Sequence, residues 1–258
     1  MATHLPRHIS LAAVTLLTAG CVGVVPVKNV ETDKLGYLTK TFTLQSVSGG
    51  VAADIKARDA GTLPFQKMVL SVTPHFEVLP GGGTPPAFHS SWTLINVGGP
   101  YVQMLDEQTS NGVETRQDYG ISYRNLLTLR GQTIQLNRTD SSMVMEVRGL
   151  QSFTPLAVAA PAPGSIDIRY EWGNPIQLAN LANLAIRCDY GARYPAARLN
   201  PKLLGEAQEL DCQYTNRNGI VQDRAVRALL TYYGVTVLVR KQTATATVNF
   251  KIDDATIS

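Results

Sequence analysis

Residues 66–79 read QKMVLSVTPHFEVL, and residues 89–97 read HSSWTLINV. In both runs apolar and β-branched side chains alternate with polar ones, which is typical of β-strands with one buried face. Between them, residues 81–86 read GGGTPP, a composition that cannot continue a hydrogen-bonded ladder. The whole segment therefore predicts a long β-hairpin.

The same short alternating runs recur along most of the chain. Gly131 and the polar cluster at 139–142 separate some of them, and Asn218-Gly219 favours a tight hairpin turn. The runs lie at 37–47, 121–129, 132–137, 143–147, 166–171, 210–215, 235–240 and 243–252. We predict a mainly β protein of antiparallel, sandwich-like sheets.

A stretch without charge, residues 154–165, holds three prolines and divides the chain. It indicates an extended connector, either between two β modules at 36–153 and 166–258 or as a long loop within one sandwich. We favour the two modules. The second also contains Asn174-Pro175, a helix-start signal, followed by roughly helical spacing at 176–185, so we expect one or two short helices there. Residues 222–233 fit either a helix or a strand.

The N-terminal segment carries the most specific motif. Arg7 precedes an apolar run at 9–17, and residues 17–21 read LTAGC. This resembles the lipobox of bacterial lipoproteins, although Thr18 stands where leucine is most common. The resemblance covers residues 1–21 only, and we recognise no family for the body. An ordinary secretory signal, leaving Cys21 a free thiol, is the alternative; the apolar run is far shorter than the roughly 20 residues of a transmembrane helix.

The lipobox implies a signal peptide at 1–20, acylation of Cys21 as a membrane anchor, and a tether at 21–35. Because Val22 stands where aspartate would retain a lipoprotein at the inner membrane, it also implies the outer membrane, with a periplasmic body. Export leaves Cys188 and Cys212 in a compartment where disulfides persist, and we predict that they are bonded. Their spacing is not the C-x-x-C of a redox pair.

Catalytic motifs are missing from the sequence. It contains no H-E-x-x-H, G-x-S-x-G or S-x-x-K motif, and no phosphate-binding glycine loop. His75 and His89, the only histidines after the signal peptide, could meet across the hairpin as a metal site, but two unrelated surface histidines are the favoured interpretation. The acidic clusters at 206–211 and 253–254 fit solvated loops. We predict no catalytic residues, no cofactor and no enzymatic activity.

The charge pattern bears on partners. A net charge of +3 is too small to indicate nucleic acid. Between residues 187 and 241 nine basic residues exceed five acidic ones, which favours an envelope protein or an anionic polymer as partner. We therefore expect a lipid-anchored, non-catalytic binding or assembly component. The alternatives are an envelope hydrolase with a carboxylate or metal site formed only in the fold, and a small-ligand-binding lipoprotein with an apolar cavity.

Overall fold

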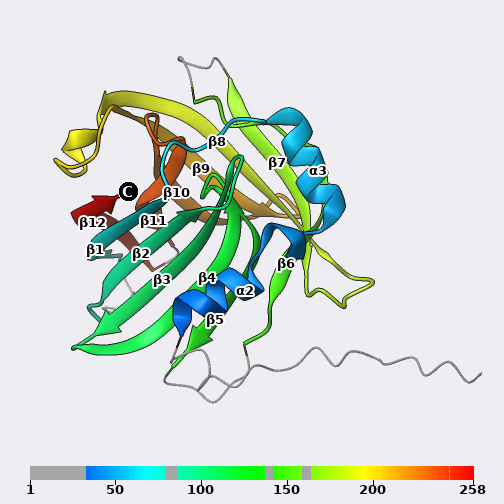
Figure 1. The fold of residues 1–258 in the computed structure, drawn as a ribbon, viewed down its shortest axis with the longest axis horizontal. Helices are drawn as coiled ribbons and strands as arrows, with labels where there is room; N and C mark the ends of the chain where they lie inside the picture. Colours follow the sequence, from blue (N-terminus) through cyan, green and yellow to red (C-terminus); the bar gives the residue numbers. More distant parts are fainter. Residues whose placement is uncertain (1–32, 80–85, 137–141, 159–163, 244) are drawn as a thin grey trace, which may run out of the picture.

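A closed antiparallel β-barrel of twelve strands forms the body of the protein (Figure 1). The computed structural model describes residues 33–79, 86–136, 142–158, 164–243 and 245–258. The prediction of a mainly β protein is confirmed. The strands are β1 (Lys67–Val78), β2 (His89–Asn96), β3 (Tyr101–Ser110), β4 (Val113–Tyr123), β5 (Leu127–Gln135), β6 (Met145–Phe153), β7 (Ser165–Gly173), β8 (Ala182–Pro195), β9 (Glu206–Asn216), β10 (Val221–Leu230), β11 (Val235–Gln242) and β12 (Ala246–Ile257).

The prediction of a two-module sandwich is wrong, because one sheet runs through the whole body. Every strand pairs with its neighbour in sequence, and β1 pairs with β12 from Met68–Ile257 to Val78–Ala246. β6 and β7, on the two sides of the connector at 154–165, are paired as well. Closure leaves no free edge strand, whereas two separate sandwiches would each have exposed edges.

Both α-helices of the described residues lie in the N-terminal part, whereas the C-terminal part, where one or two short helices were predicted, contains only the one-turn η2 (Ala196–Arg198). α2 (Lys34–Thr41) and α3 (Gly49–Arg58) occupy the region expected to begin the first strand, with η1 (Leu44–Ser46) between them. Leu38 and Phe42, four residues apart, are fully buried on one face of this segment. The expected helix at 176–185 is replaced by a loop and the start of β8, and the ambiguous 222–233 segment contains most of β10.

The two helices cover the outside of one barrel wall. α2 runs along the wall near β3, and α3 contacts β6 (Figure 1). Tyr37 and Phe42 pack on Tyr119, whose side chain points outward from β4. Tyr101 donates a hydrogen bond to the Ala52 carbonyl oxygen at 2.9 Å. Part of the hydrophobic core therefore lies outside the sheet, between the wall and the helices.

One end of the barrel, here called the closed end, is covered by its own connections. The β4–β5 turn bends inward, and Arg124 and Asn125 hold positive φ angles of 46° and 55°. Across the barrel, the Thr236 backbone N–H donates to the Arg124 carbonyl oxygen at 2.9 Å, and Asn125 Nδ2 donates to the Thr236 carbonyl oxygen at 2.8 Å. Because β4 and β11 stand on nearly opposite sides of the barrel, this turn crosses its interior.

A buried ion pair fixes the same turn. Arg124 donates to Asp59, which follows α3, through Nε at 2.6 Å and an Nη at 2.9 Å, and Tyr123 donates to the same carboxylate at 2.7 Å. The side chains of Arg124 and Asp59 are only 4% and 9% exposed. These bonds hold the pKa of Asp59 below its ordinary value, against the opposing effect of burial. The end of α3 and the turn that closes the barrel are thus one unit.

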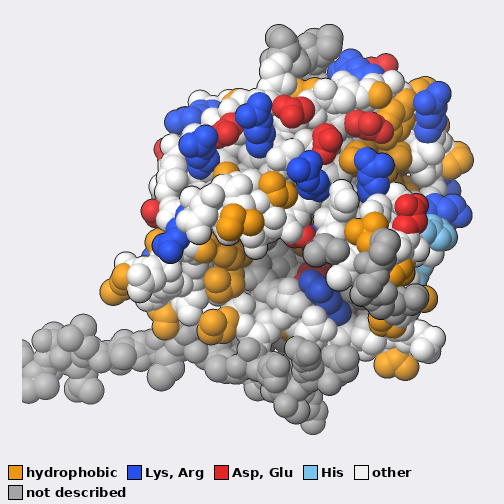
Figure 2. Space-filling model, turned by 180° about the vertical axis from the view of Figure 1, so that it is seen from behind, with side chains coloured by type: hydrophobic (Ala, Val, Ile, Leu, Met, Phe, Trp, Pro, Cys, Tyr) orange, Lys and Arg blue, Asp and Glu red, His pale blue; other side chains and the backbone are white. Residues whose placement is uncertain are grey.

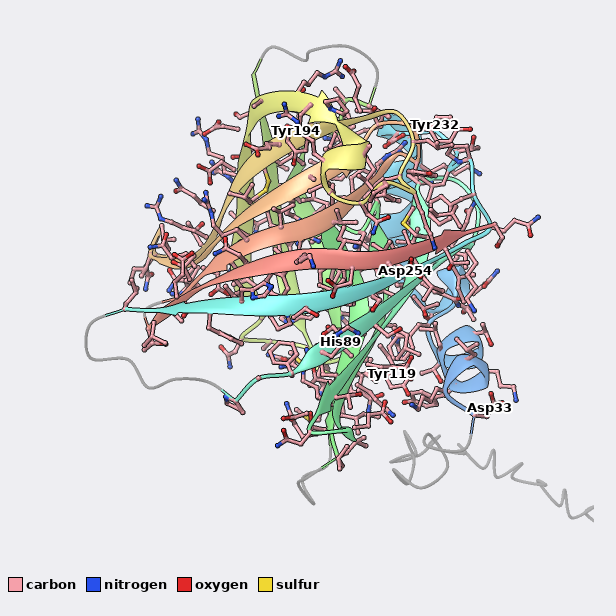
Figure 3. The ribbon with its side chains drawn as sticks, turned by 90° about the vertical axis from the view of Figure 1, so that its left-hand side faces the viewer. Asp33, His89, Tyr119, Tyr194, Tyr232 and Asp254 are labelled. Carbon is pink, nitrogen blue, oxygen red and sulfur yellow. A yellow bond between two sulfur atoms is a disulfide. The ribbon has the colours of Figure 1, made fainter. Side chains whose placement is uncertain are left out.

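The opposite end, here called the mouth, carries the β3–β4, β5–β6, β7–β8 and β9–β10 connections. α2 starts at the mouth. Its first residue, Lys34, donates to Glu107 at 2.6 Å and to Glu114 at 2.8 Å, next to the β3–β4 turn. Tyr194, at the end of β8, and Tyr232, between β10 and β11, mark the closed end. Figure 3 shows Asp33 on the opposite side of the molecule from both. The chain therefore enters the described body at the mouth.

Candidate binding cavity

The barrel encloses a cavity of about 470 Å³. Two thirds of its lining residues are apolar or aromatic, contributed by strands on all sides and by the turn at the closed end. They are Trp92, Leu94, Met104, Leu126, Leu127, Tyr170, Trp172, Leu184, Ile186, Tyr214, Ala225 and Leu238. Seen from behind, the molecule is hollowed, with basic and acidic side chains inside the hollow and hydrophobic ones beside it (Figure 2). Cavities of this size and composition take small organic ligands.

A second cavity, of about 420 Å³, adjoins the first beside β5 and β6. The two share Met104, Asp106, Thr128 and Trp172. Within the described ranges β5 and β6 pair at only two positions, Arg130–Glu146 and Gly131–Met145, the fewest of any neighbouring strands in the sheet. The shared residues make one compartment with two lobes.

Asp106 stands where the two lobes meet. Its register neighbours Trp92 and Asp118 place it on the inward face of β3. Oδ2 accepts a hydrogen bond from Gln108 Nε2 at 3.2 Å. Oδ1 is buried and, among the described residues, no donor meets hydrogen-bond geometry with it. The Ser90 hydroxyl, also buried and without a partner, lies close enough to influence this carboxyl group. Burial, together with the nearby Asp118 carboxylate, raises the pKa of Asp106 to about 6, although Gln108, Ser90 and the Arg116 charge oppose this shift.

Asp118, opposite Asp106 on β4, is fully paired. Arg116 donates to its two oxygens through Nε at 2.7 Å and an Nη at 2.9 Å, and Thr133 donates to it as well. A bidentate arginine–carboxylate pair is strong and directional. The two aspartates on neighbouring strands therefore differ: Asp118 is satisfied by the protein, and Asp106 retains an unused acceptor.

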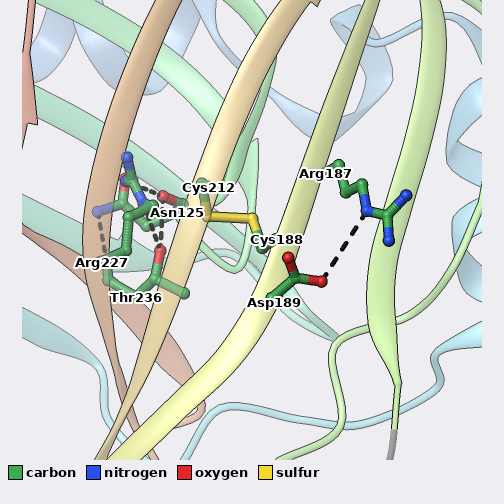
Figure 4. Close-up of a disulfide and its surroundings, with 7 residues drawn as sticks. All are labelled: Asn125, Arg187, Cys188, Asp189, Cys212, Arg227 and Thr236. Atoms are coloured by element: carbon green, nitrogen blue, oxygen red, sulfur yellow. Dashed lines mark hydrogen bonds and ion pairs between the residues drawn. A yellow bond between two sulfur atoms is a disulfide. The ribbon is translucent and has the colours of Figure 1, made fainter.

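The opposite wall carries basic groups. Arg227 points into the barrel, where it donates from Nε to Thr236 Oγ1 at 3.1 Å and to the Asn125 carbonyl oxygen (Figure 4). Asp223 and Lys241 form an ion pair at 3.1 Å, with both side chains more than a third exposed. Arg227 thus holds the closing turn in place, while the Asp223–Lys241 pair remains accessible to a ligand or solvent.

The predicted disulfide is confirmed and lies inside the barrel. Cys188 and Cys212 face each other on β8 and β9, are joined by an S–S bond of 2.07 Å, and are fully buried (Figure 4). It joins adjacent strands of the cavity wall.

The histidine candidates are placed on the outer surface near the β1–β2 hairpin. His89 Nε2 lies 2.8 Å from Ser71 Oγ, and its Nδ1 lies 3.2 Å from Thr73 Oγ1, whereas His75 pairs in register with Asn249. Within the described ranges there is no group of three or more potential metal ligands. Cys21 lies outside the described residues. Among those residues, no helix is both long and apolar enough to span a bilayer.

Sequence reasoning missed the interior aspartates. Trp92 and Trp172 both line the cavity, whereas the ring of Tyr119 packs on Tyr37 and Phe42 of the helical segment. The available signal was Asp106 itself, a carboxyl group at an alternating position in the apolar run YVQMLDE. In a strand with a buried face, an acidic residue in phase with apolar ones indicates an interior polar site.

Comparisons with known proteins add no assignment: no family model, no curated protein and no solved structure matches this chain.

Proposed function

We propose that the protein is a lipid-anchored envelope protein that binds one small, largely apolar molecule inside its barrel and does not transform it. The anchor is Cys21, and the lipobox resemblance places the body on the periplasmic side of the outer membrane. Of the three functional classes open from the sequence, the small-ligand class is the one that predicts an apolar cavity. A partner protein or anionic polymer on the outer surface is compatible with this role.

The observation that carries the proposal is Asp106 Oδ1, which has no hydrogen-bond partner among the described residues and lies where the two lobes of a mostly apolar cavity meet. A buried polar atom without a partner costs free energy, and this cost is recovered when a ligand supplies the missing donor. The ligand therefore has an apolar or aromatic body, which packs against Trp92, Trp172 and Tyr170, and at least one hydroxyl or amine that donates to Asp106.

The test is to purify the mature lipoprotein from envelopes in mild detergent and to record its native mass. We expect a bound molecule in the wild type. Ala225 is buried in the cavity wall, so Ala225→Trp fills the cavity and abolishes this extra mass. Ala192→Trp, at an exposed position on the outside of β8, is the matched control and retains it. Equal occupancy in both variants would contradict binding inside the barrel.

Asp106→Asn and Asp106→Leu refine the assignment. Loss of a hydrogen bond to a charged acceptor weakens binding by about 1.5–3 kcal/mol, or roughly 10- to 150-fold. Asn keeps an acceptor oxygen and retains part of the affinity for a hydroxyl-bearing ligand, whereas Leu retains none. If the extracted ligand binds both variants as tightly as the wild type, it does not contact Asp106.

A second candidate, an envelope hydrolase, is favoured by one observation: Asp106 and Asp118 are cross-strand neighbours in the cavity, and the pKa of Asp106 is raised to about 6. Two carboxyl groups with different environments are the usual arrangement of an acid and its partner base. The two functions are separated by comparing the molecules bound to wild type and to Asp118→Asn. An enzyme traps substrate in the variant and product in the wild type, so the masses differ. A binding protein holds the same molecule in both.

A further inference from the structure

Exposed hydrophobic side chains are concentrated at the mouth. Among the described residues ten large hydrophobic side chains are exposed, and seven lie at or beside strand ends on this side. The five most exposed are Val113 at 65%, Met143 at 61%, Ile176 at 67%, Leu178 at 93% and Ile220 at 57%. They come from four different connections: β3–β4, β5–β6, β7–β8 and β9–β10. We call these five residues the rim.

The rim is not explained by folding. Leu178 is almost completely exposed, so it contributes little to the core, and the loop that carries it is shaped by polar contacts of Asn174 and Gln177. Tight turns at a solvated barrel end ordinarily hold polar residues and glycine. Apolar residues grouped around the opening of a cavity mark a surface that meets another apolar phase. At the closed end, by contrast, the exposed large hydrophobics in the part of the chain that the structure describes are Leu204 and Tyr232.

The position of the chain entry indicates what that phase is. α2 begins at Lys34, which the bonds to Glu107 and Glu114 hold at the mouth side of the wall. Thirteen peptide steps separate Lys34 from Cys21. At roughly 3.5 Å per residue, they span at most about 45 Å. The segment is therefore long enough for a bilayer that holds Cys21 to meet the mouth, the end of the barrel where the rim is exposed.

We propose that the rim rests in the interfacial region of the bilayer, so that the cavity opens directly onto lipid. This rests on the proposed anchor at Cys21 but not on the proposed ligand. Arg217, exposed in the same turn as Ile220, is positioned to meet headgroup phosphates. With the mouth on the membrane, an amphiphilic ligand can pass between bilayer and barrel without crossing water.

The test isolates the rim from the lipid anchor. The chain from residue 21 with Cys21→Ser contains every described residue and lacks the acyl groups, and it is mixed with vesicles of phosphatidylethanolamine and phosphatidylglycerol. Flotation measures the bound fraction. We expect binding, and at least a tenfold weaker partition for the double variant Ile176→Ser, Leu178→Ser. The matched control, Leu204→Ser with Tyr232→Ser at the closed end, partitions like its parent.

Far-ultraviolet circular dichroism checks that each variant is folded, because Tyr232→Ser itself removes a near-ultraviolet chromophore. All four positions are exposed, so the substitutions are expected to leave the fold intact. Failure of the parent to float, or equal loss in the rim and closed-end variants, overturns the proposal. So does saturable crosslinking of the rim to an envelope protein without vesicle binding, which would make the partner a protein. Native mass measured on the same variants keeps the two proposals apart. If these proteins bind vesicles but carry no ligand, only the proposed ligand-binding function is contradicted. Acylation of Cys21 is tested separately, by the mass of the full lipoprotein.

Discussion

Replacing Asp106 by asparagine tests whether the barrel interior holds an unsatisfied acid. In the folded protein the carboxyl group has a pKa of about 6, and in the unfolded chain it has its ordinary value of 3.8. At about 1.4 kcal/mol per pH unit, this difference corresponds to about 3 kcal/mol. The substitution keeps the shape of the side chain and removes its ionisation.

The sign follows from proton binding. Because the folded state binds the proton more tightly, the stability that this group contributes is fully present below pH 3.8 and is lost as the pH rises through about 6. The free energy of unfolding of the wild type therefore falls over this interval relative to that of Asp106→Asn. The difference in free energy of unfolding between Asp106→Asn and the wild type is therefore larger above pH 6 than in acid, by up to about 3 kcal/mol in favour of the variant.

The assay is urea unfolding followed by far-ultraviolet circular dichroism, at about pH 4.5, pH 6 and pH 8, with the free energy from linear extrapolation. Asp211→Asn, at an exposed position on β9, is the control for a general charge effect and is expected to lack this dependence. A difference between wild type and Asp106→Asn that is the same at all three pH values would refute a buried, proton-retaining Asp106. Bound ligand has to be removed first, since a donor on Oδ1 lowers the pKa of the carboxyl group.

Three further variants test the fold. Asp59→Ala leaves Arg124 as a buried unpaired charge and is expected to cost about 3–5 kcal/mol in urea unfolding; a loss under 1 kcal/mol would contradict this. Replacing Cys188 and Cys212 by serine releases a link across 24 residues, worth about 3–4 kcal/mol, and an unchanged melting temperature would argue against it. Gly120→Ala places a Cβ 2.9 Å from a backbone carbonyl oxygen of β5, so we expect a loss of about 1–3 kcal/mol, measurable as a lower urea midpoint.

Local patterning predicted many of the strands, because a period of two depends only on neighbouring residues. It was wrong at 37–47, where the run from Tyr37 also fits the i, i+4 spacing that buries Leu38 and Phe42 on one helical face. It was wrong again after Asn174, where a helix-start signal lies in a β7–β8 loop. In both places the local sequence fits more than one kind of secondary structure, and packing against the barrel decided between them.

The candidate site was less predictable than the strands. Alternation shows that a strand has two different faces but not which of them points inward. On the outer face of the barrel wall, Tyr119 and Ile121 are as deeply buried as core residues, because α2 and α3 cover them. Inside, Asp106 and Asp118 share the cavity with tryptophan. A prediction that places apolar side chains inside the barrel and polar side chains outside it therefore misses this site.

By itself the sequence determined the β content, the antiparallel connections between neighbouring strands and the partnership of Cys188 with Cys212, since each depends on residue types and short separations. Closure depended on β1 meeting β12, a pairing between residues about 180 positions apart that no local pattern specifies. Only that tertiary contact turned the sheet into a container, enclosed Asp106, and gathered the five rim residues around one opening.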